Sequence, residues 1–125
     1  MTPSDRLALF ERDLRALMNA TDGMLLFNVV GDEDSYIQFS QRAGEPLFCE
    51  VSNRSEGWNT HSMNRPQVEK LVALGYEIPS PHHQANPNKN YSGDAGTLAT
   101  EVENIFRAVF GLADDYEVES SGIFS

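Results

Sequence analysis

The chain has 125 residues, of which 40% are hydrophobic and 10% are aromatic. A chain of this length fits one domain rather than two, and its apolar content is sufficient for a folded core. Nineteen acidic and nine basic residues give a net charge of −10. A negative protein is repelled by the phosphates of nucleic acids and by anionic lipids, so this charge opposes binding to either. We therefore expect no nucleic-acid partner and no membrane partner.

The sequence also indicates a cellular compartment. Its longest mainly apolar stretch, residues 24–30, is far shorter than the roughly 20 residues that a membrane-spanning helix needs. Residues 1–6 lack the basic and apolar regions of a secretory signal. Cys49 is the only cysteine, which excludes an intramolecular disulfide and suits the reducing cytosol. We expect a cytoplasmic protein.

The N-terminal half predicts one helix and three strands. Thr2 is suited to cap a helix that begins at Pro3, and apolar residues three and four positions apart continue the pattern to about residue 19. Three short apolar or alternating segments follow, separated by turn residues. These segments are residues 24–30, 35–40 and 47–52. Short connections between consecutive strands are typical of an antiparallel meander.

A second helix is expected in the middle of the chain. Residues 53–65 show no periodicity and are expected to form a loop. The helix then begins near Pro66 and is closed by Gly75. The side chains expected to face inward are Val68, Leu71 and Val72.

Residues 77–93 are expected to form a loop, and the segment after them is expected to form a helix. Residues 77–93 are rich in Pro, Asn and His, which predicts a long loop that is either a binding loop or mobile. The last helix is expected to begin at Ser92 or Asp94 and to end at Gly111. Its apolar stripe consists of Leu98, Val102, Ile105, Phe106, Val109 and Phe110.

Together these elements predict an α+β fold. Three apolar helix faces need one common surface, and one face of an antiparallel sheet supplies it. We expect a two-layer sandwich in which an antiparallel sheet of three or more strands packs against helices. Residues 1–118 would form this single domain, and residues 119–125 would form a flexible tail that is acidic and rich in Ser and Gly. If residues 113–125 folded over the sheet, this acidic segment could act as an internal competitor for a basic partner.

Four segments carry a resemblance to a known family. They are residues 50–54 (Glu-Val-Ser-Asn-Arg), 71–76 (Leu-Val-Ala-Leu-Gly-Tyr), 90–91 (Asn-Tyr) and 106–111 (Phe-Arg-Ala-Val-Phe-Gly). In this order and spacing, the chain resembles the TY-Chap family from about residue 3 to 118. That family groups bacterial domains, common in actinobacteria, that are similar to type III secretion chaperones. The resemblance implies an α/β sandwich, often a homodimer, that holds partly unfolded or extended partner segments, and it implies no catalytic motif.

Potential catalytic and metal-binding residues do not form a recognisable set. His61, His82 and His83 are the only histidines, and the adjacent pair would point in opposite directions in an extended segment. No second cysteine is available to complete a zinc site. Cys49 occupies an inward-facing strand position, where a thiol usually acts as a small hydrophobic group. We therefore expect no enzymatic activity, no metal and no cofactor.

Three aromatic residues are candidates for partner binding. Tyr36 and Phe48 alternate with the inward-facing positions of their strands, so both are expected on the outer face of the sheet. Trp58 lies in a polar loop. Exposed aromatic side chains often mark protein interfaces. The alternative is that the tail or residues 77–93 cover them.

Three functional hypotheses follow from these observations. The leading one is a non-catalytic, chaperone-like module that binds a protein or peptide and holds an extended or partly folded partner. The alternative is a structural homodimeric adaptor without a client, in which the outer face of the sheet is the dimer interface. The third is a small hydrolytic enzyme that uses His61, His82 or His83 with nearby acids, although no complete catalytic set can be named.

Overall fold

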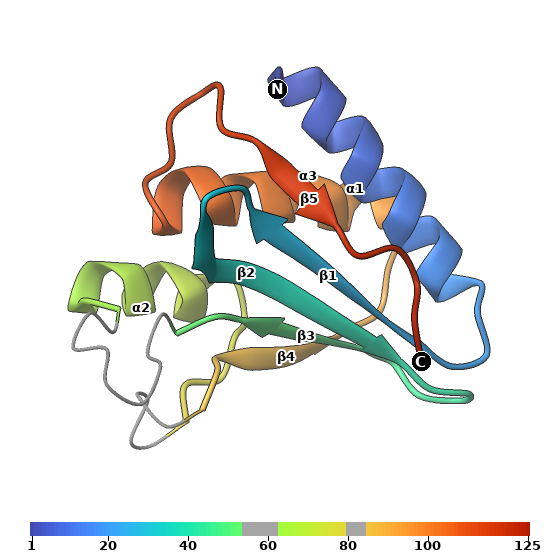
Figure 1. Ribbon diagram of the computed structural model, residues 1–125. Coiled ribbons are helices and arrows are strands. Elements are labelled where there is room, and N and C mark those ends of the chain that lie inside the picture. Colours follow the sequence, from blue (N-terminus) through green and yellow to red (C-terminus); the bar gives the residue numbers. More distant parts are fainter. Residues whose placement is uncertain (54–62, 80–84) are drawn as a thin grey trace.

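A computed structural model describes residues 1–53, 63–79 and 85–125. The described residues form helices on one side of a five-stranded sheet, in which the strand order is β4-β3-β2-β1-β5 and every neighbouring pair is antiparallel (Figure 1). The elements in chain order are α1 (Pro3–Met18), β1 (Gly23–Val29), β2 (Asp32–Gln41), β3 (Leu47–Val51), α2 (Arg65–Ala73), β4 (Asn88–Tyr91), α3 (Ala95–Asn104), the π-helical segment η1 (Ile105–Val109) and β5 (Val118–Ser120). The predicted α+β class is confirmed.

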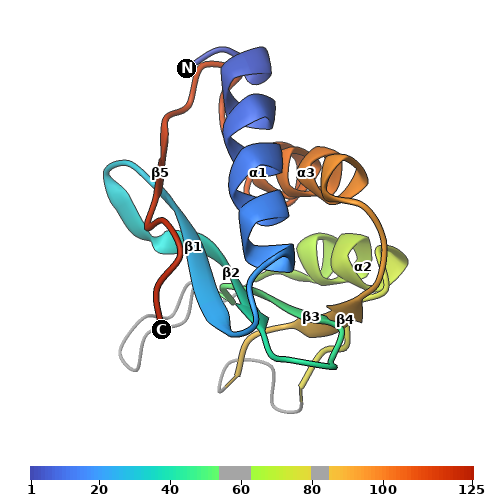
Figure 2. The same ribbon diagram turned by 90° about the vertical axis from the view of Figure 1, so that its right-hand side faces the viewer.

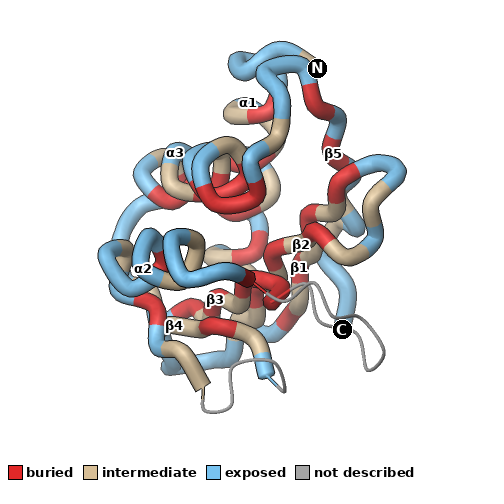
Figure 3. The backbone as a smooth tube through the Cα atoms, turned by 90° about the vertical axis from the view of Figure 1, so that its left-hand side faces the viewer, coloured by how far each residue is buried: buried red, intermediate tan, exposed pale blue. Residues whose placement is uncertain are grey.

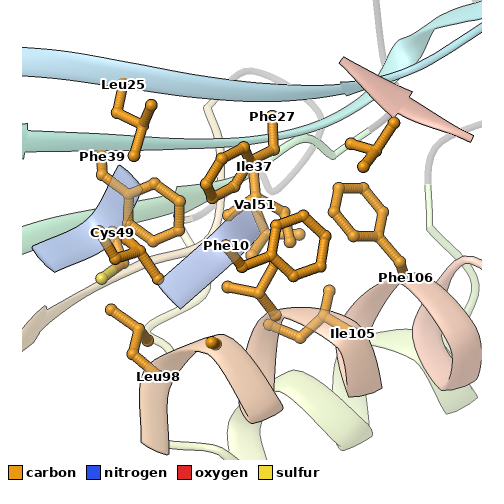
Figure 4. Packing of buried hydrophobic residues seen from close by; sticks show 14 of the residues in the cluster. Phe10, Leu25, Phe27, Ile37, Phe39, Cys49, Val51, Leu98, Ile105 and Phe106 are labelled. Atoms are coloured by element: carbon orange, nitrogen blue, oxygen red, sulfur yellow. The ribbon is translucent and has the colours of Figure 1, made fainter. Parts of the chain in front are cut away.

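The helices α1, α2 and α3 cover the same face of the sheet (Figure 2). Buried and exposed residues alternate along α1 and α3, as expected for helices with one apolar side, whereas α2 is mainly exposed (Figure 3). The core fills the space between the two layers, and its largest fully buried apolar side chains include Phe10, Phe27, Phe39, Phe106, Leu14, Leu25, Ile37 and Leu98 (Figure 4). No helix of the described residues covers the opposite face of the sheet.

Aromatic contacts join the elements at the centre of the core. The ring centroid of Phe10 on α1 lies 4.7 Å from that of Phe27 on β1 and 6.0 Å from that of Phe106 on η1. The rings of Phe27 and Phe39 meet edge to face at 5.7 Å, which continues the cluster onto β2. Such pairs add packing energy beyond the area that they bury. The first helix is therefore fixed to both the sheet and the last helix.

The predicted first helix and meander are confirmed because local sequence specifies both. The Thr2 hydroxyl accepts a hydrogen bond from the Asp5 amide at 3.1 Å, and Pro3 occupies the first turn. Strands β1 to β3 follow in hairpin order, and side chains in each alternate between buried and half-buried. The inward positions of β2 and β3 predicted from alternation are all buried: Ile37, Phe39, Leu47, Cys49 and Val51.

Helix α2 departs from the prediction on one face. Leu71 is fully buried as expected, but Val72, expected to face inward, is 54% exposed. Successive helical residues are about 100° apart around the helix axis, so Leu71 and Val72 cannot both lie at the centre of one face. Polar contacts fix the orientation instead: Gln67 and Lys70 donate hydrogen bonds to the carbonyls of the last turn of η1 at 2.7 and 3.0 Å.

The segment 77–93, expected to be a long loop, contains strand β4. The strand was not predicted because the sequence Asn-Lys-Asn-Tyr has no apolar alternation. Lys89 and Tyr91 are opposite the buried Cys49 and Leu47 and so face inward. The Lys89 ammonium donates hydrogen bonds to the Leu74 carbonyl and to Glu101, both at 2.8 Å. Lys89 also lies over the Tyr76 ring, 4.7 Å from its centroid. A polar cluster therefore holds this edge of the sheet to the helices.

The structure also gives the end of the chain an ordered place in the sheet. Residues 118–120 form β5, so Glu119 and Ser120, assigned above to a flexible tail, pair with β1. Phe124 forms a further antiparallel bridge with Met24. Tyr116 and Val118 are 8% and 6% exposed. Sequence alone did not identify β5 because three residues carry little pattern and the partner strand is about 90 residues earlier.

Candidate functional site

The outer face of the sheet is the candidate site. Antiparallel register places its side chains in rows across the strands, because directly opposite residues point to the same side. One row runs from Met24 through Ser40 and Phe48 to Asn90. The next runs from Leu26 through Gln38 and Glu50 to Asn88, and the third includes Asn28 and Tyr36. Side chains from three or four strands are therefore presented on one surface.

Two depressions lie on this face. The first has a volume of about 640 Å³, and its lining includes Met24, Phe48 and Glu50 from the strands and Pro46 from the β2–β3 turn. The second, of about 450 Å³, is lined among others by Leu26, Val30, Tyr36 and Glu119. Gln38, at the centre of the face, lines both. The two depressions thus adjoin across the middle of the sheet.

Carboxylates dominate the charge of this surface. Among the described lining residues of the two depressions, Glu33, Glu45, Glu50 and Glu119 are acidic and Arg42 is basic. The Glu50 side chain is half-buried, and this burial raises the pKa of its carboxyl. A cation placed beside Glu50 would therefore interact more strongly than one at a fully solvated carboxylate.

The three aromatic candidates have different outcomes. Tyr36 and Phe48 both lie half-buried on the outer face, and each lines a different depression. Phe48 is directly opposite Ser40, four residues after Tyr36, so about 13 Å of strand separates the two rows. The Tyr36 hydroxyl accepts a hydrogen bond from the Asn86 side chain at 3.2 Å. Trp58 lies outside the described residues.

Two apolar members of the surface were missed by the sequence analysis. Met24 and Leu26 on β1 face outward and are half-buried, while Leu25 and Phe27 between them are fully buried. The strand is apolar on both faces, so its pattern reads as a buried segment rather than as an alternating one. The outward direction of Met24 and Leu26 could have been inferred from the neighbouring strand β2, whose residues alternate and to which β1 is joined by a tight turn.

Of the residues considered by name for catalysis, the structure describes Cys49. His61, His82 and His83 all lie outside the described residues. Cys49 is fully buried on the helix-facing side, and burial raises the pKa of its thiol to about 12, so the nucleophilic thiolate is scarce near neutral pH. Within residues 1–53, 63–79 and 85–125, no group of three or more His, Cys, Asp or Glu side chains is placed to hold a metal ion.

Among the described residues of this α+β domain, helices cover one face of the sheet, and the other face is partly apolar and acidic. A family model described as "T3SS (YopN, CesT) and YbjN peptide-binding chaperone 3" (TY-Chap3) matches residues 4–122. The chain therefore belongs to this family of peptide-binding chaperone domains, and that membership points to binding rather than catalysis. No curated protein and no solved structure gives a significant match. No helix among the described residues has the length and apolar content needed to cross a membrane.

Proposed function

We propose that this domain binds an extended or partly folded segment of a partner protein on the outer face of its sheet and holds it without chemical change. The observation that carries the proposal is the pair of adjoining depressions, where half-buried apolar side chains lie beside carboxylates. The other face of the sheet is filled by the core and is not available to a partner. Membership of a peptide-binding chaperone family supports the same role.

The geometry suits an extended ligand. In an extended peptide, alternate side chains point to the same side, about 6.5 Å apart. Apolar side chains of the ligand would enter the depressions beside Met24, Phe48 and Leu26. The polar amides of Gln38 and Asn90 in the same surface can pair with main-chain groups of the ligand. The binding energy then comes from apolar contact and the register from hydrogen bonds.

The charge of the surface selects the partner. Four carboxylates around the depressions favour a ligand with Lys or Arg between its apolar residues, both for attraction and for rapid encounter. The same carboxylates disfavour nucleic acid and anionic membrane as partners. They also weigh against a symmetric dimer through this face, because two copies would bring like charges together. A client with basic residues is the occupant that this surface fits best.

Direct binding measurements test the proposal. The probes are seven-residue peptides, the length of β1, in which apolar residues alternate with Lys, and matched peptides that carry Glu in place of Lys. We expect binding of the lysine peptides only, and weaker binding at high salt.

Variants then locate the surface. Glu50→Lys should lose the lysine peptide, and Phe48→Ala should weaken it. The matched control is Glu69→Lys, because Glu69 lies on α2 away from the outer face and its side chain is 65% exposed. Equal loss in the control, or equal binding of the lysine and glutamate peptides, would refute the proposed site.

A further inference from the structure

The outer edge of strand β1 is occupied by the chain itself. Beyond β5, residues 121–124, here called the edge segment, continue along β1 toward its beginning. Phe124 exchanges two main-chain hydrogen bonds with Met24, at 2.6 and 3.0 Å. The Ser121 amide donates to the Leu26 carbonyl at 2.9 Å, and the Ser121 hydroxyl accepts from the Leu26 amide at 2.9 Å. The main-chain groups that β1 would offer to an added strand are thus already used.

The residues before the edge segment are firmly anchored. Arg6, which is fully buried, donates hydrogen bonds to the carbonyls of Asp114 and Tyr116 at 2.9 and 3.0 Å. The side chains of Tyr116 and Val118 are packed into the core. The Val30 amide donates to the Glu117 carbonyl at 3.0 Å. This part of the chain cannot leave without opening the core.

The apolar side chains of the edge segment are more exposed than those of Tyr116 and Val118. Ile123 and Phe124 are 40% and 44% exposed. Gly122 has a φ of +66°, which breaks the regular strand, and the adjacent Leu26 amide is bound by a hydroxyl instead of a carbonyl. Few buried contacts and an interrupted ladder are the features of a segment that opens locally. Release of residues 121–124 would leave the packed core intact.

The edge segment also adjoins the candidate site. Phe124 is directly opposite Met24, and Met24 lines the first depression and begins the row that ends at Asn90. The Ile123 side chain points to the helix-covered side of the sheet. A Cβ atom placed on Gly23 would lie 2.9 Å from the Cγ2 atom of Ile123 and 3.3 Å from the side chain of Leu17, which belongs to the core. The segment therefore places one apolar side chain on each side of the sheet edge.

We propose that residues 121–124 are an internal occupant of a strand-addition site, and that an extended partner segment replaces them on β1. The inference rests on the proposed function and adds the main-chain site and its regulation to it. The replacing strand bonds to the free groups of Met24 and Leu26 and carries two consecutive apolar residues in place of Ile123 and Phe124. Flanking Lys or Arg residues reach the carboxylates of the outer face. A partner must therefore bind β1 strongly enough to displace the edge segment.

A disulfide lock tests the replacement in the full chain. Met24 and Phe124 form a hydrogen-bonded antiparallel pair, whose Cα atoms are about 5.5 Å apart, within the range that a disulfide spans. In the variant Met24→Cys/Phe124→Cys, the reduced form is the control for the oxidised one, because both have the same side chains. Native Cys49 is buried and does not compete for the new bond.

The probe is a synthetic peptide that copies residues 121–124, Ser-Gly-Ile-Phe, with a lysine at each end. We expect the oxidised form to bind it at least about tenfold more weakly than the reduced form, because apparent affinity follows the fraction of open chains. For the same reason, Ile123→Ser/Phe124→Ser should bind it about tenfold more tightly than the wild type. Both variants change exposed or half-buried positions, and circular dichroism checks that they fold.

The outcomes separate the inference from the proposed function. If the copied peptide binds the oxidised and reduced forms of the lock variant equally, replacement on β1 is wrong, and binding of the alternating lysine peptides then supports the outer face alone. If no lysine peptide binds any form, the proposed function fails together with the inference.

Amide hydrogen exchange of the wild type gives a measurement that needs no ligand. The Met24 and Leu26 amides should exchange at least about tenfold faster than the Val30 amide, since only the first two are bound by the edge segment. Equal protection of the three amides would show that the segment does not open by itself and would overturn the inference.

Discussion

Arg6 and Tyr116 join the first helix to the segment that leads into β5. The guanidinium carbon of Arg6 lies 3.9 Å from the centroid of the Tyr116 ring, and its Nη1 donates a hydrogen bond to the Tyr116 carbonyl at 3.0 Å. The Nε of the same group donates to both carboxylate oxygens of Glu103 on α3, at 3.0 and 2.9 Å. One fully buried cation therefore links α1, α3 and the approach to β5.

Replacing this arginine should strongly destabilise the fold. Arg6→Met keeps much of the side-chain volume but leaves Glu103 without its cation and several carbonyls without a donor. Removing one member of a buried pair costs about 3–5 kcal/mol. Urea unfolding followed by circular dichroism measures the loss. Arg12→Met is the control: Arg12 is 71% exposed, so its pair with Asp13 is worth less than about 1 kcal/mol. Similar losses in the two variants would contradict the role of Arg6.

The orientation of α2 leads to a second prediction. Leu71→Ala should reduce the free energy of unfolding by about 2–5 kcal/mol, because it empties part of the core. Val72→Ala should change it by less than about 0.5 kcal/mol, because Val72 is largely exposed. The two positions are adjacent and both are apolar, so each variant is the control for the other. Chemical unfolding of the two proteins in parallel decides between the observed orientation and one with Val72 inward.

Which features the sequence could predict depends on how local their causes are. Thr2 and Pro3 specify the start of α1, and alternation in β2 places Ile37 inward and Tyr36 outward. The strand β4 and the burial of Arg6 depend on partners far along the chain: Lys89 is inward because Glu101 meets it, and Arg6 because Glu103 does. A lysine or arginine without such a partner would face water.

The candidate site was predictable to a similar extent. Alternation identified Tyr36 and Phe48 as outward residues, but it could not show that they line different depressions, since that depends on strand register. Met24 and Leu26 were hidden because β1 carries apolar side chains on both faces. The contribution of residues 121–124 to the β1 edge requires a contact across nearly the whole chain, which no local pattern encodes.

The cluster beneath β4 gives a third prediction. The side chains of Lys89 and Glu101 are only 12% and 17% exposed, and their charged groups are 2.8 Å apart. Glu101→Gln leaves the Lys89 ammonium with a weaker partner in a poorly solvated place and should cost about 3 kcal/mol. The double variant Lys89→Met/Glu101→Gln removes the unpaired charge and should recover part of that loss. A double-mutant cycle in urea measures the coupling, and additive losses would show that the pair is energetically independent.

Cys49 should make stability depend on pH above neutrality. Burial, the largest cause, raises the pKa of its thiol from 9.0 to about 12; Lys89 opposes this shift and Glu101 adds to it. Below pH 9.0 both folded and unfolded chains keep the proton, so the stabilising contribution is fully present. Between 9.0 and about 12 the unfolded chain loses the proton first, so the free energy of unfolding falls as pH rises. One such group contributes a slope of up to about 1.4 kcal/mol per pH unit.

The measurement compares the wild type with Cys49→Ala by urea unfolding from about pH 8 to about pH 11. The variant loses packing at every pH, but its stability should fall less steeply. Part of the slope should remain, because burial also raises the pKa of Tyr76 and Tyr116. In agreement with a buried neutral thiol, a thiol-specific reagent should modify native Cys49 only at the rate of unfolding. Parallel pH profiles for the two proteins, or rapid modification of the native chain, would show that Cys49 is not held in the neutral state.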